Sequence, residues 1–129
     1  RSAGSLAAAR WGTQEWVHFL EGLPPTLDAA PLAALDQAGH FTGTPNAEIA
    51  QRWYPLTVRS GYTRARPALR AFLTGIGRMK LILPSWEALA ATPEGLAWAR
   101  EVFAAARTGY HPITVAAVQA KLDRSATAQ

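Results

Sequence analysis

Apolar residues recur at helical spacing along almost the whole sequence, and no segment alternates apolar and polar residues as a strand would. The first such run follows a predicted helix cap at Thr13. Its apolar residues stand at i, i+3, i+4 and i+7: Trp16, Phe19, Leu20 and Leu23. Similar runs continue nearly to the end, so the pattern predicts about seven helices of roughly eight to sixteen residues. The expected fold class is all-α.

Prolines and capping residues set the predicted ends of these helices. The segment ATPEG predicts the clearest start, with Thr92 as the cap and the proline after it as the first helical residue. Helices are also expected to open at Pro31, Pro84 and Pro112, because the first turn leaves its N–H groups unpaired and proline has none. Pro55 lies inside an apolar stripe, where it predicts a kink or a tightened turn.

Short connections between the predicted helices make neighbours antiparallel, which favours stacked antiparallel helical hairpins. The chain has 129 residues, of which 49% are hydrophobic, and suits one domain with a packed core. We expect the helical domain to cover residues 13–123. Residues 1–12 are expected to be a linker, the remainder of a longer chain, or a weak helix. Residues 124–129 are expected to form a frayed tail.

The sequence offers no candidate catalytic machinery or metal site of its own. It contains no cysteine, which excludes disulfides, thiol nucleophiles and cysteine-ligated metals. His18, His40 and His111 stand far apart, and there is no HExxH pair, GxSxG elbow or phosphate loop. The acidic residues are scattered singly, so no acid–base pair is predicted. No apolar run approaches the ~20 residues of a membrane span, and no membrane partner is expected.

Four arginines gather around one predicted helix start: Arg59, Arg64, Arg66 and Arg70. Together with the net charge of +4, this cluster could suit an anionic partner such as nucleic acid. However, Arg64 and Arg66 do not share a helix face, and no row of aromatic residues accompanies them. The favoured interpretation is a solvated face or local ion pairs with Glu48 or Asp36. We therefore predict no nucleic-acid partner, and weak binding stays an alternative.

The stretch GIGRMKLILP, residues 75–84, places two cations, Arg78 and Lys80, at the junction of two predicted helices. One interpretation is that both complement the negative C-terminal end of the preceding helix and point into water. The other is that they bind an anionic ligand together. Side chains at i and i+2 can converge on one ligand in a bend, which Gly75 and Gly77 make easy. Arginine then offers a planar fork to a carboxylate, and lysine adds a point charge.

Three motifs occur in the order and spacing of one known family, over roughly residues 14–123. An Asn-x-Glu-Ile run that leads into an Arg-Trp helix is matched by Asn46, Glu48, Ile49, Arg52 and Trp53. A Gly-Arg-Met-Lys run is matched by Gly77, Arg78, Met79 and Lys80. A His-Pro-Val/Ile-Thr segment is matched by His111, Pro112, Ile113 and Thr114. The sequence thereby resembles the C-terminal domain of the leukotriene A4 hydrolase branch of M1 zinc aminopeptidases.

The resemblance implies an armadillo-like α-α superhelix that packs against a catalytic, thermolysin-like domain of the same chain and closes one side of its active-site cavity. It implies zinc in the parent enzyme, bound by residues upstream, and neither zinc nor a catalytic residue in this chain. It assigns to Arg78 and Lys80 the anchoring of the free carboxylate of a short peptide substrate. Leu83 departs from the pattern, since leukotriene A4 hydrolase itself is expected to have an arginine there. This departure weakens the case for lipid-epoxide chemistry and leaves the peptidase interpretation untouched.

Two further functions stay open beside the peptidase interpretation. The chain could be a helical scaffold for protein–protein contacts, and an exposed apolar patch would fit both that role and a domain separated from its catalytic partner. The parent could also be an epoxide hydrolase. The scaffold hypothesis and the peptidase hypothesis can be distinguished by the upstream gene sequence, which encodes a metallopeptidase only under the second.

Overall fold

The computed structural model describes residues 12–24, 26–76 and 78–128, and these residues form seven α-helices and no strand. The helices are α2 (Thr13–Glu21), α3 (Ala29–Gly39), α4 (Ala47–Arg59), α5 (Arg66–Gly75), α6 (Met79–Ala90), α7 (Pro93–Ala106) and α8 (Pro112–Ala128). Two short 3₁₀ helices, η1 (Thr63–Ala65) and η2 (Arg107–Gly109), stand before α5 and α8. The predicted all-α fold class is confirmed. Over the described ranges, no helix is both long and apolar enough to cross a membrane.

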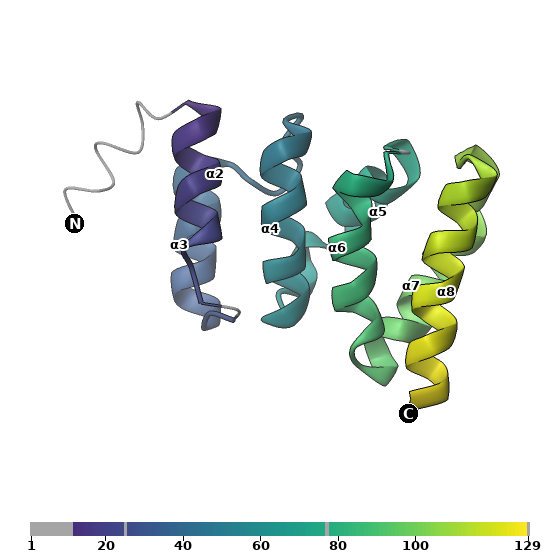
Figure 1. Ribbon diagram of the computed structural model, residues 1–129. Coiled ribbons are helices and arrows are strands. Elements are labelled where there is room, and N and C mark those ends of the chain that lie inside the picture. The colour runs from purple at the N-terminus through teal and green to yellow at the C-terminus, as the bar shows by residue number, and fades with distance from the viewer. Residues whose placement is uncertain (1–11, 25, 77, 129) are drawn as a thin grey trace.

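The helices stack in two layers (Figure 1). In one layer α2, α4, α6 and α8 lie side by side, and each packs against the next. In the other layer lie α3, α5 and α7, with α5 packed against α7. This arrangement agrees with the predicted stack of helical hairpins. It places α4 between α2 and α6, so that side chains of α4 can reach both neighbours.

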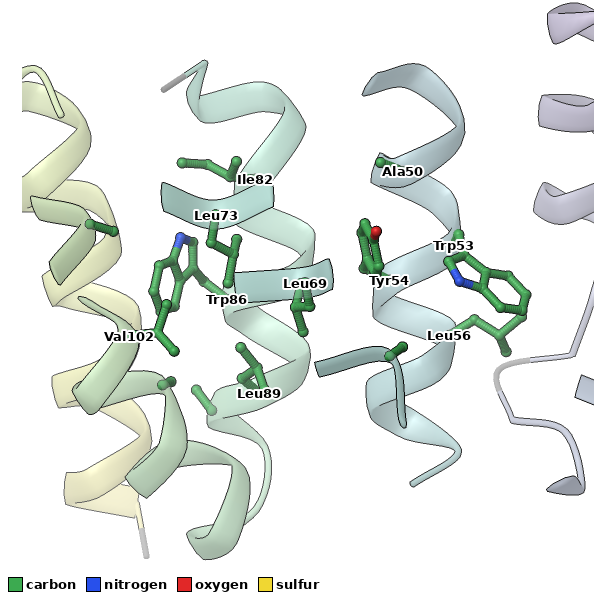
Figure 2. Close-up of a cluster of buried hydrophobic side chains, with 14 of the residues drawn as sticks. Ala50, Trp53, Tyr54, Leu56, Leu69, Leu73, Ile82, Trp86, Leu89 and Val102 are labelled. Carbon is green, nitrogen blue, oxygen red and sulfur yellow. The ribbon is translucent and has the colours of Figure 1, made fainter. Parts of the chain in front are cut away.

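The core is one continuous cluster of buried side chains that runs through the stack. Its largest members, Trp53 on α4 and Trp86 on α6, are completely buried. Each packs against a second aromatic ring: Phe41 lies 4.9 Å from Trp53, and Phe103 lies 5.7 Å from Trp86, measured between centroids. Figure 2 shows how apolar side chains fill the space between the helices. Burial of one large apolar side chain contributes about 1.5–3 kcal/mol, so this cluster is the main source of stability.

Side-chain caps begin α4 and α7, among other helices. Thr92 accepts a hydrogen bond from the N–H of Gly95 at 3.0 Å and begins α7, which confirms the start predicted from ATPEG. Asn46 accepts hydrogen bonds from the N–H groups of Glu48 and Ile49, at 3.0 and 3.3 Å, and begins α4. Both caps give partners to N–H groups that have none inside the helix.

Two other predicted helix starts were displaced by one or two residues. The cap of α2 is Gly12, one residue before the predicted Thr13, and the N–H of Gly12 donates to the side chain of Glu15 at 3.0 Å. Helix α3 begins at Ala29, so Pro31 lies in its first turn instead of opening it. In the first turn a proline costs no hydrogen bond, because those N–H groups lack carbonyl partners wherever the helix begins.

Two prolines lie inside helices of the same layer. Pro55 lies within α4 and Pro84 within α6. The prediction that a helix opens at Pro84 was wrong, because α6 begins at Met79. Each proline deprives the carbonyl four residues earlier of its helical donor, and these carbonyls belong to Gln51 and Lys80. The second of these belongs to a residue that the sequence singled out as a candidate site residue.

Candidate functional site

Arg78 and Lys80 lie at the beginning of α6, and both are exposed. Arg78 is the N-cap, with extended backbone angles of φ −73° and ψ 115°. Its carbonyl accepts hydrogen bonds from the N–H groups of Leu81 and Ile82 at 3.0 and 3.3 Å. Lys80 follows in the first turn. Gly77 lies outside the described residues, so the geometry of the Gly-Arg-Met-Lys run is given from Arg78 onward.

The charges of Arg78 and Lys80 are not explained by the helix end that carries them. The preceding helix, α5, ends at Gly75, and the two cations belong to the N-terminal end of α6. That end of a helix has partial positive charge and favours anions. The charges are thus not accounted for by the helix to which the two residues belong, and the interpretation that they complement the C-terminal end of α5 stays an alternative. Within the described ranges, neither side chain forms an ion pair.

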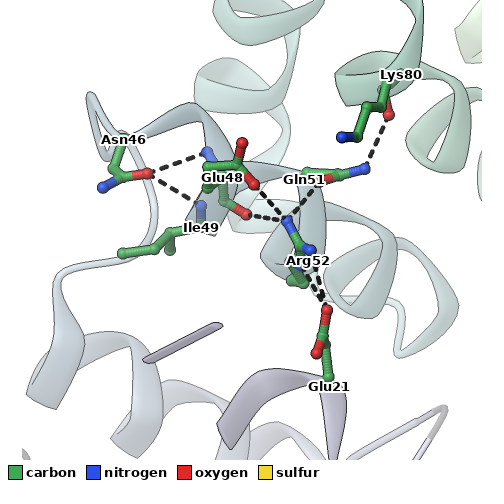
Figure 3. A network of polar contacts seen from close by, with 7 residues as sticks. All are labelled: Glu21, Asn46, Glu48, Ile49, Gln51, Arg52 and Lys80. Carbon is green, nitrogen blue, oxygen red and sulfur yellow. Dashed lines mark hydrogen bonds and ion pairs between the residues drawn. The ribbon is translucent and has the colours of Figure 1, made fainter. Parts of the chain in front are cut away.

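A polar network joins α2, α4 and α6 beside Lys80 (Figure 3). The side-chain amide of Gln51 donates a hydrogen bond to the main-chain carbonyl of Lys80 at 2.8 Å. The oxygen of the same amide accepts a hydrogen bond from the guanidinium of Arg52. Arg52 in turn forms ion pairs with Glu21 of α2 and Glu48 of α4, both at 2.9 Å. The first turn of α6 is thereby tied to two other helices.

The residues of the first motif have structural roles in α4. Asn46 caps the helix, and Glu48 pairs with Arg52 one turn later. Ile49 and Trp53 are buried in the core. These contacts account for the residue types of the motif without a bound ligand.

The last motif begins α8. Pro112 is the first residue of the helix, as predicted, and Nδ1 of His111 accepts a hydrogen bond from the N–H of Ile113 at 3.1 Å. Thr114 is buried. Ile113 is 65% exposed, and no other large hydrophobic side chain in the described part of the chain is exposed to a comparable degree. Most of this motif therefore builds the helix start, and one residue presents an apolar side chain to the outside.

The described residues include no group of three or more His, Asp or Glu side chains that could hold a metal ion. His18 lies on α2, His40 follows α3 and His111 precedes α8, and all three are exposed. A zinc site needs three or four such ligands converging on one point. The described residues of this chain do not fit a zinc ion.

The four-arginine cluster is partly engaged inside the domain. Arg66 forms a two-pronged ion pair with Glu94, with both nitrogen–oxygen distances at 2.6 Å, and its guanidinium lies 5.0 Å from the ring centroid of Trp98. Hydrogen bonds from Arg66 lower the pKa of the Glu94 carboxyl. The partner of Arg66 is thus Glu94 and not the predicted Glu48 or Asp36; Glu48 pairs with Arg52, and Asp36 accepts hydrogen bonds from Thr42 and Tyr62. With Arg66 engaged, the cluster does not present four free cations to a phosphate backbone.

Sequence reasoning missed Gln51, although it contacts the candidate site directly. The signal that could have found it is the spacing of Lys80 and Pro84, which leaves the carbonyl of Lys80 without a helical donor. Which side chain supplies the donor depends on the packing of α4 against α6.

Leu83, the position that departs from the family pattern, is half-buried and packs against the core.

Comparisons with known proteins agree with the resemblance. The family model described as "Leukotriene A4 hydrolase, C-terminal" matches residues 11–122. A protein named Leucine aminopeptidase 2 from Eremothecium gossypii is 38% identical over 80 residues, which are 62% of this chain and 12% of that protein. A protein of the same name from Yarrowia lipolytica is 32% identical over 73 residues, which are 57% of this chain and 11% of that protein.

The matched segments are thus a small part of the length of these relatives. The family model, by contrast, covers nearly the whole of this sequence. The all-α stack described above is also the fold that the resemblance implies. The chain belongs to the family of leukotriene A4 hydrolase C-terminal domains.

Proposed function

We propose that this chain is the non-catalytic, C-terminal helical domain of a zinc aminopeptidase that removes N-terminal residues from short peptides. The domain packs against a catalytic domain of the same chain and closes one side of the active-site cavity. Arg78 and Lys80 anchor the free C-terminal carboxylate of the peptide. The family match and the two relatives named as aminopeptidases support this proposal.

The observation that carries the proposal is the contrast among the three motifs. The first and last motifs cap helices, form an ion pair or fill the core. The side chains of Arg78 and Lys80 do none of these, and they belong to a helix end where positive charge is unfavourable. Residues whose charge is unfavourable where they stand, and which form no stabilising contact in return, are expected at functional sites.

The two cations suit a carboxylate. Arginine can donate two parallel hydrogen bonds to its two oxygens, and lysine adds a compact charge on a flexible stem. Anchoring one end of the peptide limits how much chain fits between the anchor and the reacting bond, so short peptides are preferred. The zinc ion of the catalytic domain would supply an activated water molecule. This chain contributes only binding and orientation.

The test compares kcat/KM for a tripeptide and for its C-terminal amide in the full-length enzyme. Arg78→Ala should lower the value for the acid by about 10- to 150-fold, the range of a charge-assisted hydrogen bond worth about 1.5–3 kcal/mol, and should spare the amide. Arg70→Ala is the matched control, because Arg70 is an exposed arginine on the neighbouring helix α5. Equal losses for acid and amide, or no loss in either, would refute the anchoring role.

A further inference from the structure

Proline in a helix leaves one carbonyl without its donor, and in α6 this carbonyl belongs to Lys80. Pro84 stands four residues later, lacks an N–H, and its ring also pushes that carbonyl away from the helix axis. The carbonyl is therefore free to accept a hydrogen bond from outside the helix. The same turn is also held at its beginning, where the carbonyl of the N-cap Arg78 accepts hydrogen bonds from the N–H groups of Leu81 and Ile82.

Gln51 supplies that donor at 2.8 Å from α4 (Figure 3). An amide has one oxygen and one NH₂ group, so a partner on one end fixes what the other end can do. The guanidinium of Arg52 donates to the oxygen of Gln51, and this leaves the NH₂ group for the carbonyl of Lys80. Arg52 is itself held by Glu21 and Glu48. The orientation of Gln51 is thus determined by contacts on both sides.

We propose that Gln51 is a positioning residue for the carboxylate anchor. By holding the carbonyl of Lys80, it fixes the turn whose first and third residues are Arg78 and Lys80, and so it fixes the direction of both cations. This inference rests on the proposed function, because it concerns the same anchor. Gln51 itself does not touch the substrate.

The test uses the full-length enzyme and the ratio of kcat/KM for a tripeptide acid to that for its C-terminal amide. Gln51→Met keeps the length of the side chain and removes the donor, and it should lower the ratio by about threefold to tenfold, the range of one hydrogen bond. The loss should fall on the acid, with kcat/KM for the amide unchanged.

A second variant tests whether the effect of Gln51→Met acts through the carbonyl of Lys80. Pro84→Ala returns an N–H to the position four residues after Lys80, so the helix can supply the donor itself. The double variant Gln51→Met/Pro84→Ala should therefore regain the wild-type ratio to within about twofold, since the helical hydrogen bond replaces the lost one. Gln119→Met is the matched control, because Gln119 donates a comparable hydrogen bond to Asp123 on α8, away from the site. It should leave the ratio unchanged.

Each result decides between the two proposals. If Arg78→Ala lowers the ratio and Gln51→Met leaves it at the wild-type value, the positioning role is refuted and the anchor stands. If Gln51→Met lowers the ratio and the double variant does not recover, the effect does not act through the carbonyl of Lys80, and the positioning role is again refuted. If Arg78→Ala itself leaves the ratio unchanged, the proposed function fails and the positioning role fails with it.

Discussion

Replacement of Tyr110 by phenylalanine tests how strongly the second half of the domain depends on one buried polar contact. Tyr110 lies between η2 and α8, is only 8% exposed, and donates its hydroxyl hydrogen bond to the carbonyl of Leu73 at the end of α5. Burial raises the pKa of Tyr110 from 10.0 to about 12. The folded domain therefore keeps the hydroxyl protonated at a pH where the unfolded chain has already lost the proton.

The sign of the pH effect follows from proton binding. Below pH 10 both states hold the proton, and the contribution of Tyr110 to stability is complete. Between pH 10 and 12 the unfolded state binds fewer protons than the folded state, so the free energy of unfolding falls as pH rises. A shift of one pKa unit is worth about 1.36 kcal/mol. The free energy of unfolding should therefore fall, through Tyr110 alone, by about 1.4 kcal/mol at pH 11 and by about 2.7 kcal/mol above pH 12.

The assay is urea unfolding of wild type and Tyr110→Phe at pH 8, 10 and 11. At pH 8 the variant should be less stable by about 0.5–1.5 kcal/mol, the value of one hydrogen bond. The difference between the two proteins should then shrink by about 1.4 kcal/mol at pH 11, because phenylalanine has no proton to lose. Taking the difference cancels the titration of the other two tyrosines. A difference that stays constant from pH 8 to pH 11 would refute the reasoning.

Three further substitutions can be tested by urea unfolding at neutral pH. Thr92→Ala removes the cap of α7 and should lower the free energy of unfolding by about 1 kcal/mol, with Thr92→Ser close to wild type. Gly95→Ala places a Cβ against the carbonyl oxygen of Leu89, and the resulting shift of α7 should cost about 1–3 kcal/mol; an unchanged midpoint would contradict that contact. Lys80→Gln removes a cation from a helix N-terminus and should stabilise the domain by about 0.3–1 kcal/mol, while it lowers the preference for a peptide acid over its amide; a loss of stability would mean that Lys80 has a structural partner.

The helices that begin with purely local contacts could be predicted from the sequence. The start of α7 is the best case, because the Thr92 side chain bonds an N–H only three residues away. The start of α8 at Pro112 is another. In both, the residues that decide the boundary lie within one turn of each other, so a short window of sequence holds all the information.

The start of α6 could not be predicted in the same way. A proline after an apolar run normally opens or ends a helix, and Pro84 was interpreted by that rule. In the structure Pro84 is the sixth residue of α6, and Gln51, on another helix, donates to the carbonyl that the proline leaves free. The partner of Arg66 was missed for the same reason, since Glu94 lies 28 residues away along the chain. Long-range partners are set by packing, which no local pattern records.

Two unfavourable features meet in the first turn of α6. One is a carbonyl deprived of its donor by Pro84, and the structure compensates it with Gln51 and the ion pairs that hold Arg52. The other is a pair of cations at the positive end of a helix, and no described residue compensates it with an ion pair. The hydrogen bond from Gln51 ties the first turn of α6 to α4, and under the proposed function the two cations are available to an anion from outside the domain. A tethered turn with uncompensated charge suits the carboxylate anchor that we propose, because a tether reduces the ordering that opposes binding.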